Sequence, residues 1–137
     1  MTTKTKEANF QAESKKSGDE FEDKVLDIIK KETGVSLIER DYVVEGIGVE
    51  VDFFVKGKRI NKYIECKGGN PGGAKRPGAE RTDNVKKAIA NGALLKAVAP
   101  DAYYIVYFSA KPKNGNSSHL MIQTALLAGY IDEVHYI

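Results

Sequence analysis

The chain has 137 residues, enough for a single domain with its own hydrophobic core. It carries 21 basic and 19 acidic residues, so the formal net charge of +2 does not by itself indicate a nucleic-acid-binding protein. One cysteine excludes an internal disulfide and a cysteine-based zinc site, and two histidines are too few for a multi-histidine metal site. No apolar run approaches the ~20 residues that cross a bilayer, so we expect a soluble, cytoplasmic protein without a membrane partner.

The first segment, residues 1–16, is polar and lacks a periodic apolar pattern, which predicts a flexible basic arm. Residues 17–137 are expected to form one domain. Ser17 or Asp19 is the predicted N-cap of a helix that ends at Gly34. The apolar residues of this helix recur at helical spacing and form one stripe: Phe21, Val25, Ile28 and Ile29.

Three strands are predicted next, over Leu37–Glu45, Val49–Val55 and Ile60–Lys67. The stretch that follows, residues 68–78, contains five of the 13 glycines and is predicted to be a long loop. A long loop inside a compact domain is usually functional or disordered.

The second half of the chain alternates helical and strand-like patterns. The predicted elements are a helix from Thr82 or Asp83 to just before Pro100, a strand at Tyr103–Ser109, a helix at Ser118–Ala128 capped by Gly129, and a strand at Glu133–Ile137. The whole order is αβββαβ followed by αβ. It predicts a three-layer α/β/α sandwich with a central mixed sheet.

Acidic side chains gather on one face of the predicted hairpin. Alternation along Val49–Val55 separates Glu50 and Asp52 from an apolar set that includes Val51, Phe53 and Val55. On the next strand Glu65 and Lys67 share a face, while Ile64 and Cys66 share the other. We expect Val51, Phe53 and Val55 to pack beside Ile64 and Cys66.

Two registers of this hairpin remain open. A two-residue loop at Lys58-Arg59 makes the numbers of paired residues sum to 117 and sets Asp52 opposite Glu65. A turn centred on Gly57-Lys58 makes the sum 115 and sets Glu50 opposite Glu65. Either odd sum keeps the acids and Lys67 on one face, because only a one-residue slip reverses the faces.

Carboxylates that converge in this way repel one another unless a cation offsets their charge. Mg²⁺ favours one or two carboxylates together with phosphate oxygens, and a lysine beside the metal can hold or activate a water. A Glu-x-Lys triplet alone is more often an exposed ion pair. Its position, after an alternating strand with acids and before a glycine-rich basic loop, favours a catalytic site.

At these residues the chain resembles the PD-(D/E)XK nucleases, the restriction-endonuclease-like superfamily. The family pattern is a glutamate on the first helix, an aspartate on the second core strand and (D/E)-x-K on the third. Glu22, Asp52 and the triplet Glu65-Cys66-Lys67 match it over about residues 17–109. The proline that gives the family its name is replaced by Val51, as in many members.

The resemblance implies a role for each matched residue. Asp52 and Glu65 would hold Mg²⁺, for which Mn²⁺ would substitute, and Lys67 would position and activate the attacking water. Glu22 would bind the metal directly or through water. Glu50 is an extra acid that replaces Asp52 as ligand if the register shifts.

A basic segment follows the triplet. Residues 67–87 contain six basic and two acidic residues, a net charge of +4, as expected where DNA phosphates bind. The predicted DNA-binding residues are Lys75, Arg76, Arg81, Asn84 and Lys86. Of these, Asn84 or Lys86 would extend from the second helix into the catalytic site.

The function expected from this resemblance is a Mg²⁺-dependent DNA endonuclease of restriction or repair type. The alternatives are a Holliday junction resolvase-like endonuclease and a non-catalytic DNA-binding module with the nuclease fold. A homodimer is expected for either nuclease, because two sites related by a two-fold axis can cut both strands of a duplex.

Overall fold

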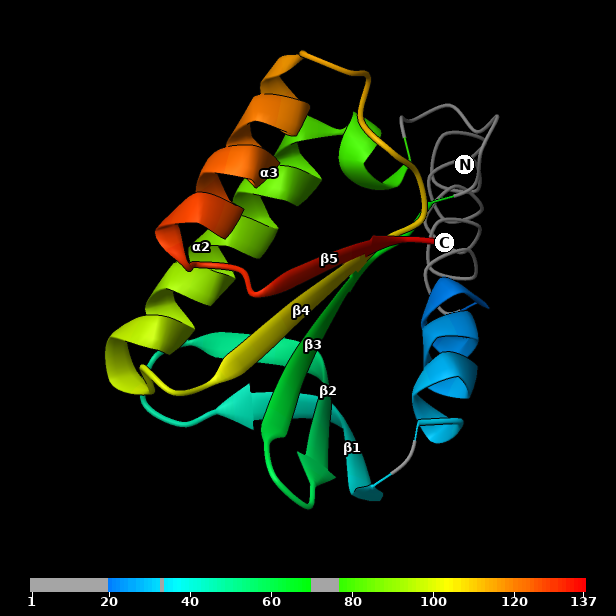
Figure 1. The fold of residues 1–137 in the computed structure, drawn as a ribbon, viewed down its shortest axis with the longest axis vertical. Coiled ribbons are helices and arrows are strands. Elements are labelled where there is room, and N and C mark those ends of the chain that lie inside the picture. Colours follow the sequence, from blue (N-terminus) through cyan, green and yellow to red (C-terminus); the bar gives the residue numbers. More distant parts are fainter. Residues whose placement is uncertain (1–19, 33, 70–76) are drawn as a thin grey trace, which may run out of the picture.

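A computed structural model describes residues 20–32, 34–69 and 77–137 of the chain. The predicted arm, residues 1–16, and most of the glycine-rich loop lie outside these residues. The described part is a mixed α/β fold around one five-stranded sheet, flanked by helices (Figure 1). Among the described residues, no helix combines the length and the apolar character needed to span a membrane.

The sheet has the order β1-β2-β3-β4-β5. Its strands are β1 (Val35–Val44), β2 (Val49–Gly57), β3 (Asn61–Lys67), β4 (Tyr103–Phe108) and β5 (Glu133–Tyr136). The first three strands are antiparallel neighbours, whereas β3, β4 and β5 are parallel to one another. The sheet is therefore mixed, as predicted.

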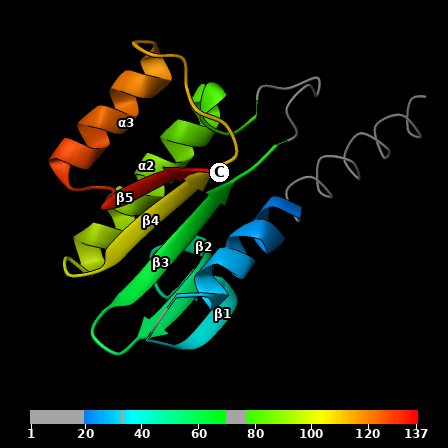
Figure 2. The same ribbon diagram turned by 45° about the vertical axis from the view of Figure 1, so that its right-hand side comes forward.

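Helices cover both faces of the sheet. Residues 20–30 form a helix on one face, while α2 (Thr82–Val98) and α3 (Ser117–Ala128) lie on the other (Figures 1 and 2). A short 3₁₀ turn, η1 (Gly78–Glu80), precedes α2. Each face has its own hydrophobic core cluster, so the fold has the three layers of an α/β/α sandwich.

The predicted bounds are close to the observed ones. β4 is buried over its last five residues, because helices cover both of its faces, and Gly129 caps α3 in the left-handed conformation with φ 79°. Strand bounds differ by one or two residues. The largest difference is in the first helix, which ends at residue 30, so that Gly34, with φ 82°, lies in the link to β1.

The β1–β2 hairpin bends sharply at Asp41 and Asp52. Asp41 has φ 50°, which is rare for a residue other than glycine, and the two residues are missing from the pairing, which otherwise runs without a gap from Leu37 to Val44. Beyond the bend Val51 joins the core under α2 and α3, whereas Phe53 and Val55 join the core under the first helix. The prediction that Val51 packs beside Phe53 and Val55 is therefore wrong, because alternation along the sequence does not detect a bend.

Candidate metal centre

The β2–β3 register is the first of the two predicted ones. Phe53 pairs with Ile64 and Phe54 with Tyr63, so the residue numbers sum to 117. The pairing stops at Phe53. One residue further, Oδ2 of Asp52 accepts a hydrogen bond from the Cys66 backbone N–H at 2.6 Å. The side chain of Asp52 thus occupies the place where the two strands separate.

Glu65 lies beside Asp52 and is held from two sides. Its side chain is buried, and the residue is only 4% exposed. Nδ2 of Asn91 on α2 donates a hydrogen bond to Oε2 of Glu65 at 2.8 Å, and Nζ of Lys67 is 3.8 Å from Oε1. A buried carboxylate with an amide donor and an ammonium neighbour has a fixed orientation.

Glu22 reaches the same place from the first helix. The start of the described helix packs against the end of β3, since a Cβ added to Gly68 would lie only 2.9 Å from Cβ of Phe21. Carboxylate oxygens of Glu22, Asp41 and Asp52 all lie within 4.8 Å of one another. We call Glu22, Asp41, Asp52 and Glu65 the acidic cluster.

Burial and mutual repulsion raise the pKa values of Glu22 and Asp52 in this cluster. Burial, followed by hydrogen bonding and repulsion from Asp52, raises the pKa of Glu22 to about 7. Burial and the neighbouring Glu65 carboxylate also raise the pKa of Asp52, although the Cys66 N–H opposes this shift. Arg40, at 3.5 Å from Glu22, offsets only part of the negative charge.

The donor set fits a hard divalent cation. Three carboxylates, those of Glu22, Asp41 and Asp52, meet in one place, and Glu65 adjoins them through Asp52. Among the described residues, the cations paired with this cluster are Arg40 and Lys67. All the converging donors are oxygens, which suits Mg²⁺ or Mn²⁺, while Cys66 belongs to the core under the first helix. A bound cation would reverse the effect of repulsion on both raised pKa values.

The remaining predicted site residues lie elsewhere. Glu50 is exposed on the far side of the bend and pairs with Val43, so the prediction that it shares a face with Asp52 and Glu65 is wrong. Neither Asn84 nor Lys86 bonds to the acidic cluster. The amide of Asn84 donates to the Gly78 carbonyl at 3.0 Å, and Lys86 lines a groove between α2 and α3.

The predicted DNA-binding residues are described in part. Arg81 stands at the junction of η1 and α2, with its guanidinium 3.8 Å from Asp83. Lys75 and Arg76 lie outside the described residues. The two described ends of the glycine-rich loop meet, because the Gly78 N–H donates to the Gly68 carbonyl at 3.4 Å.

Sequence reasoning missed Asp41 and Asn91. Asn91 lies seven residues, or two helical turns, after Asn84, on the same side of α2. An asparagine inside a helix is unfavourable and is a signal for a buried partner. The neighbouring Gly92 allows α2 to approach the sheet, since an added Cβ would lie 2.8 Å from the Tyr104 ring. Asp41 is likewise at an unfavourable position, because aspartate is depleted in strands, and its presence in the predicted strand indicates a specific role.

Comparisons of this chain with protein-family models, with curated proteins and with solved structures each give no match. The functional argument therefore rests on the residues of the acidic cluster and their surroundings.

Proposed function

We propose that this protein is a Mg²⁺-dependent DNA endonuclease of the PD-(D/E)XK type. The observation that carries the proposal is the meeting of Asp52 with Glu65 and Lys67 where β2 and β3 separate, with Nζ of Lys67 at 3.8 Å from Glu65. Glu22 joins Asp52 from the first helix, where the family pattern has its glutamate.

In this mechanism Asp52 and Glu65 would hold the cation, and Glu22 and Asp41 would be further oxygen ligands, direct or through water. The cation would supply a Lewis acid for the scissile phosphate. Lys67 holds the attacking water beside Glu65. The water oxygen would bond to phosphorus and release a proton to the solvent, while the bond to the leaving sugar oxygen breaks and that oxygen takes up a proton from the solvent.

The basic segment after β3 supplies the proposed DNA contacts. Arg81 lies at the start of α2, and Lys75 and Arg76 belong to the stretch outside the described residues. These cations would neutralise phosphates next to the cut, so cleavage should weaken as salt rises.

We further propose that the protein acts as a dimer through α3. No residue of α3 is an aspartate, glutamate, lysine or arginine, yet Leu120 is 57% and Leu127 is 89% exposed. A groove of about 450 Å³ runs between α2 and α3 beside these leucines, lined by residues that include Ile89 and Met121. Lys86 is the one charged residue among the described residues that line this groove. A second copy is the occupant that the uncharged α3 favours, because a two-fold axis through α3 would bring no like charges of this helix together.

The decisive experiment is nicking of supercoiled plasmid in Mg²⁺ or Mn²⁺. We expect cleavage by the wild type and a decrease of at least 100-fold for Lys67→Ala. Lys56→Ala is the control, because it removes an exposed lysine at the end of the β2–β3 ladder that is distant from the cluster. Absence of nicking, or equal nicking by Lys67→Ala, would overturn the proposal.

A four-way junction offered beside linear duplex then separates the two nuclease types. Preferred cutting of the junction identifies a resolvase-like enzyme, whereas cutting of duplex identifies a restriction or repair enzyme. DNA affinity without cleavage under any metal identifies the binding module.

A further inference from the structure

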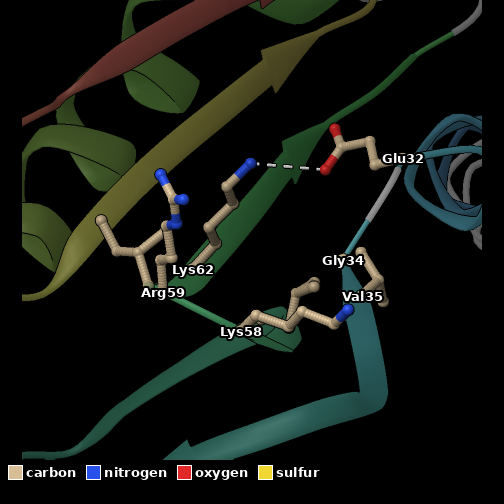
Figure 3. Close-up of a pocket in the computed structure, with 9 residues that line it drawn as sticks. Glu32, Gly34, Val35, Lys58, Arg59 and Lys62 are labelled. Carbon is tan, nitrogen blue, oxygen red and sulfur yellow. Dashed lines mark hydrogen bonds and ion pairs between the residues drawn. The ribbon is translucent and has the colours of Figure 1, made fainter.

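A cavity of about 420 Å³ lies at the opposite end of β3 from the acidic cluster (Figure 3). Its walls come from the link after the first helix, from the start of β1 and from the β2–β3 turn. Lys62 is five residues before Lys67, a distance of ~17 Å along a strand. The cavity is therefore separate from the proposed metal centre.

Cations dominate the wall of this cavity. Lys58, Arg59 and Lys62 line it, and Glu32 is the single acidic residue among the described residues that line it. Nζ of Lys62 is 3.4 Å from Glu32, while neither Lys58 nor Arg59 forms an ion pair with a described residue. Figure 3 shows Arg59 and Lys62 extending in one direction and Lys58 extending toward Val35. The cavity thus has two cationic side chains beyond the one that Glu32 neutralises.

The surroundings make this an ordered site. The backbone N–H of Lys58 donates to the Gly34 carbonyl at 3.1 Å, which ties the turn that bears the cations to the start of β1. Lys62 and Glu32 have side chains only 27% and 33% exposed, so solvent screens their charges less than at an open surface. Lys62 also interacts electrostatically with Glu133. That carboxylate already has hydrogen bonds with Tyr103 and His135.

We propose that this cavity binds a nucleotide through its phosphate group. The Arg59 guanidinium and the Lys62 ammonium, which extend in one direction, match phosphate oxygens (Figure 3), and Lys58 adds a further positive charge to the wall. The volume is within the range of small-molecule sites and exceeds the needs of phosphate alone. Val35, Val55 and the half-exposed Ile60 form an apolar wall that can cover a sugar or base. The phosphate belongs either to a free nucleotide or to a nucleic acid strand that extends from the metal centre.

The test is a titration of ¹⁵N-labelled protein with deoxyadenosine monophosphate in EDTA, so that no cation contributes. We expect saturable shifts of the Lys58 and Arg59 amides, and none of these shifts with deoxyadenosine, which lacks the phosphate. The double variant Lys58→Ala/Arg59→Ala should bind at least 10-fold more weakly. Lys56→Ala, an exposed lysine that does not line the cavity, is the matched control and should change affinity less than twofold.

Glu32→Gln should increase the affinity for the mononucleotide, a result that misfolding would not produce. It removes the acid and releases Lys62, so affinity should rise two- to fivefold. No saturable binding by the wild type, or equal losses in Lys56→Ala and in the double variant, would overturn the proposal.

A short single-stranded oligonucleotide without terminal phosphates distinguishes the two sources. If the double variant binds it more weakly and the mononucleotide displaces it, the ligand is a nucleic acid strand. If its affinity is unchanged, the ligand is a free nucleotide. Lys67→Ala should retain mononucleotide binding, so failure of the nuclease proposal remains distinguishable from failure of this one.

Discussion

Asp52 accepts a hydrogen bond from the backbone N–H of Cys66 at 2.6 Å, just beyond the last pair of the β2–β3 ladder. The carboxylate therefore satisfies a strand amide that the neighbouring strand leaves without a partner. The same side chain lies between Glu22 and Glu65 in the acidic cluster. Asp52 thus combines a structural role with a proposed metal-binding role, and substitutions can separate them.

Asp52→Asn keeps an oxygen acceptor for the Cys66 N–H and removes a negative charge from the cluster. Its free energy of unfolding without metal should equal or exceed that of the wild type. Asp52→Ala leaves the amide without its acceptor and should be less stable by ~1–3 kcal/mol. Both variants should lose nicking and Mg²⁺ affinity. Urea denaturation and metal titration check these outcomes, and equal instability of the two variants would contradict the structural role.

Stability without metal should depend on pH. Since the pKa of Glu22 is raised to about 7 and that of Asp52 is also raised, the folded protein binds protons more tightly than the unfolded chain. The contribution of these protons is complete below pH ~4 and is lost as pH rises through about 7. We therefore expect the free energy of unfolding to decrease as the pH rises through this window.

Mg²⁺ provides the matching control for this pH dependence. The cation replaces the lost protons, so it should raise Tm clearly at pH 8 and much less at pH 5. Thermal denaturation with Mg²⁺ and with EDTA at both pH values measures the difference. If Mg²⁺ raised Tm equally at the two pH values, metal binding would not depend on the carboxylates whose pKa values are raised.

Asn91 is a positioning residue for Glu65. Asn91→Ala removes the amide donor from a buried carboxylate, so we expect a loss of ~1–3 kcal/mol in stability and weaker Mg²⁺ affinity. Asn91→Asp adds a negative charge there and should be less stable than Asn91→Ala at pH 8, with the difference vanishing near pH 4. Asn114→Ala, in an exposed loop, is the control. A pH-independent difference would argue against the contact with Glu65.

Asp41 combines an unusual backbone conformation with a carboxylate of the acidic cluster. The φ of 50° at Asp41 suits glycine better than a residue with a Cβ. Asp41→Gly should therefore raise the free energy of unfolding by ~1 kcal/mol. Asp41→Ala should have a free energy of unfolding ~1–2 kcal/mol below that of Asp41→Gly. Asp41→Asn tolerates the same φ and removes only the charge. Comparing its Mg²⁺ affinity with that of the wild type therefore measures the contribution of the carboxylate alone.

The proposed dimer depends on the uncharged surface of α3. Leu127→Glu would place two like charges in the interface, and sedimentation velocity should then show a monomer. Val43→Glu makes the same change at a residue that is 63% exposed on β1, and it should leave the dimer intact. Dissociation by both variants, or by neither, would exclude α3 as the interface.

Local patterns in the sequence predict most of the fold and part of the site. Alternation along Val49–Val55 and the turn residues leave two registers open, and the structure has the one that brings Asp52 to the level of Glu65. The helical stripe that begins at Phe21 predicts which side of the first helix packs on the sheet, and hence the position of Glu22.

The residues that were missed depend on contacts between distant elements. The bend at Asp41 turns Glu50 away from the cluster. The alternation of apolar and polar residues does not reveal that one residue, Asp41, has a positive φ. Asn91 reaches Glu65 only because α2 crosses the sheet closely at Gly92. The angle and depth of such a crossing are set by tertiary packing, which a one-dimensional pattern does not contain.

The hairpin bend has a consequence for the order in which the protein acquires activity. Val51 and Phe53, on either side of Asp52, belong to different hydrophobic cores, so the acidic cluster is complete only when both cores have assembled. A nascent or partly unfolded chain with one core in place would lack the ligands for the cation. If the protein cleaves DNA as proposed, cleavage would then be restricted to fully folded molecules.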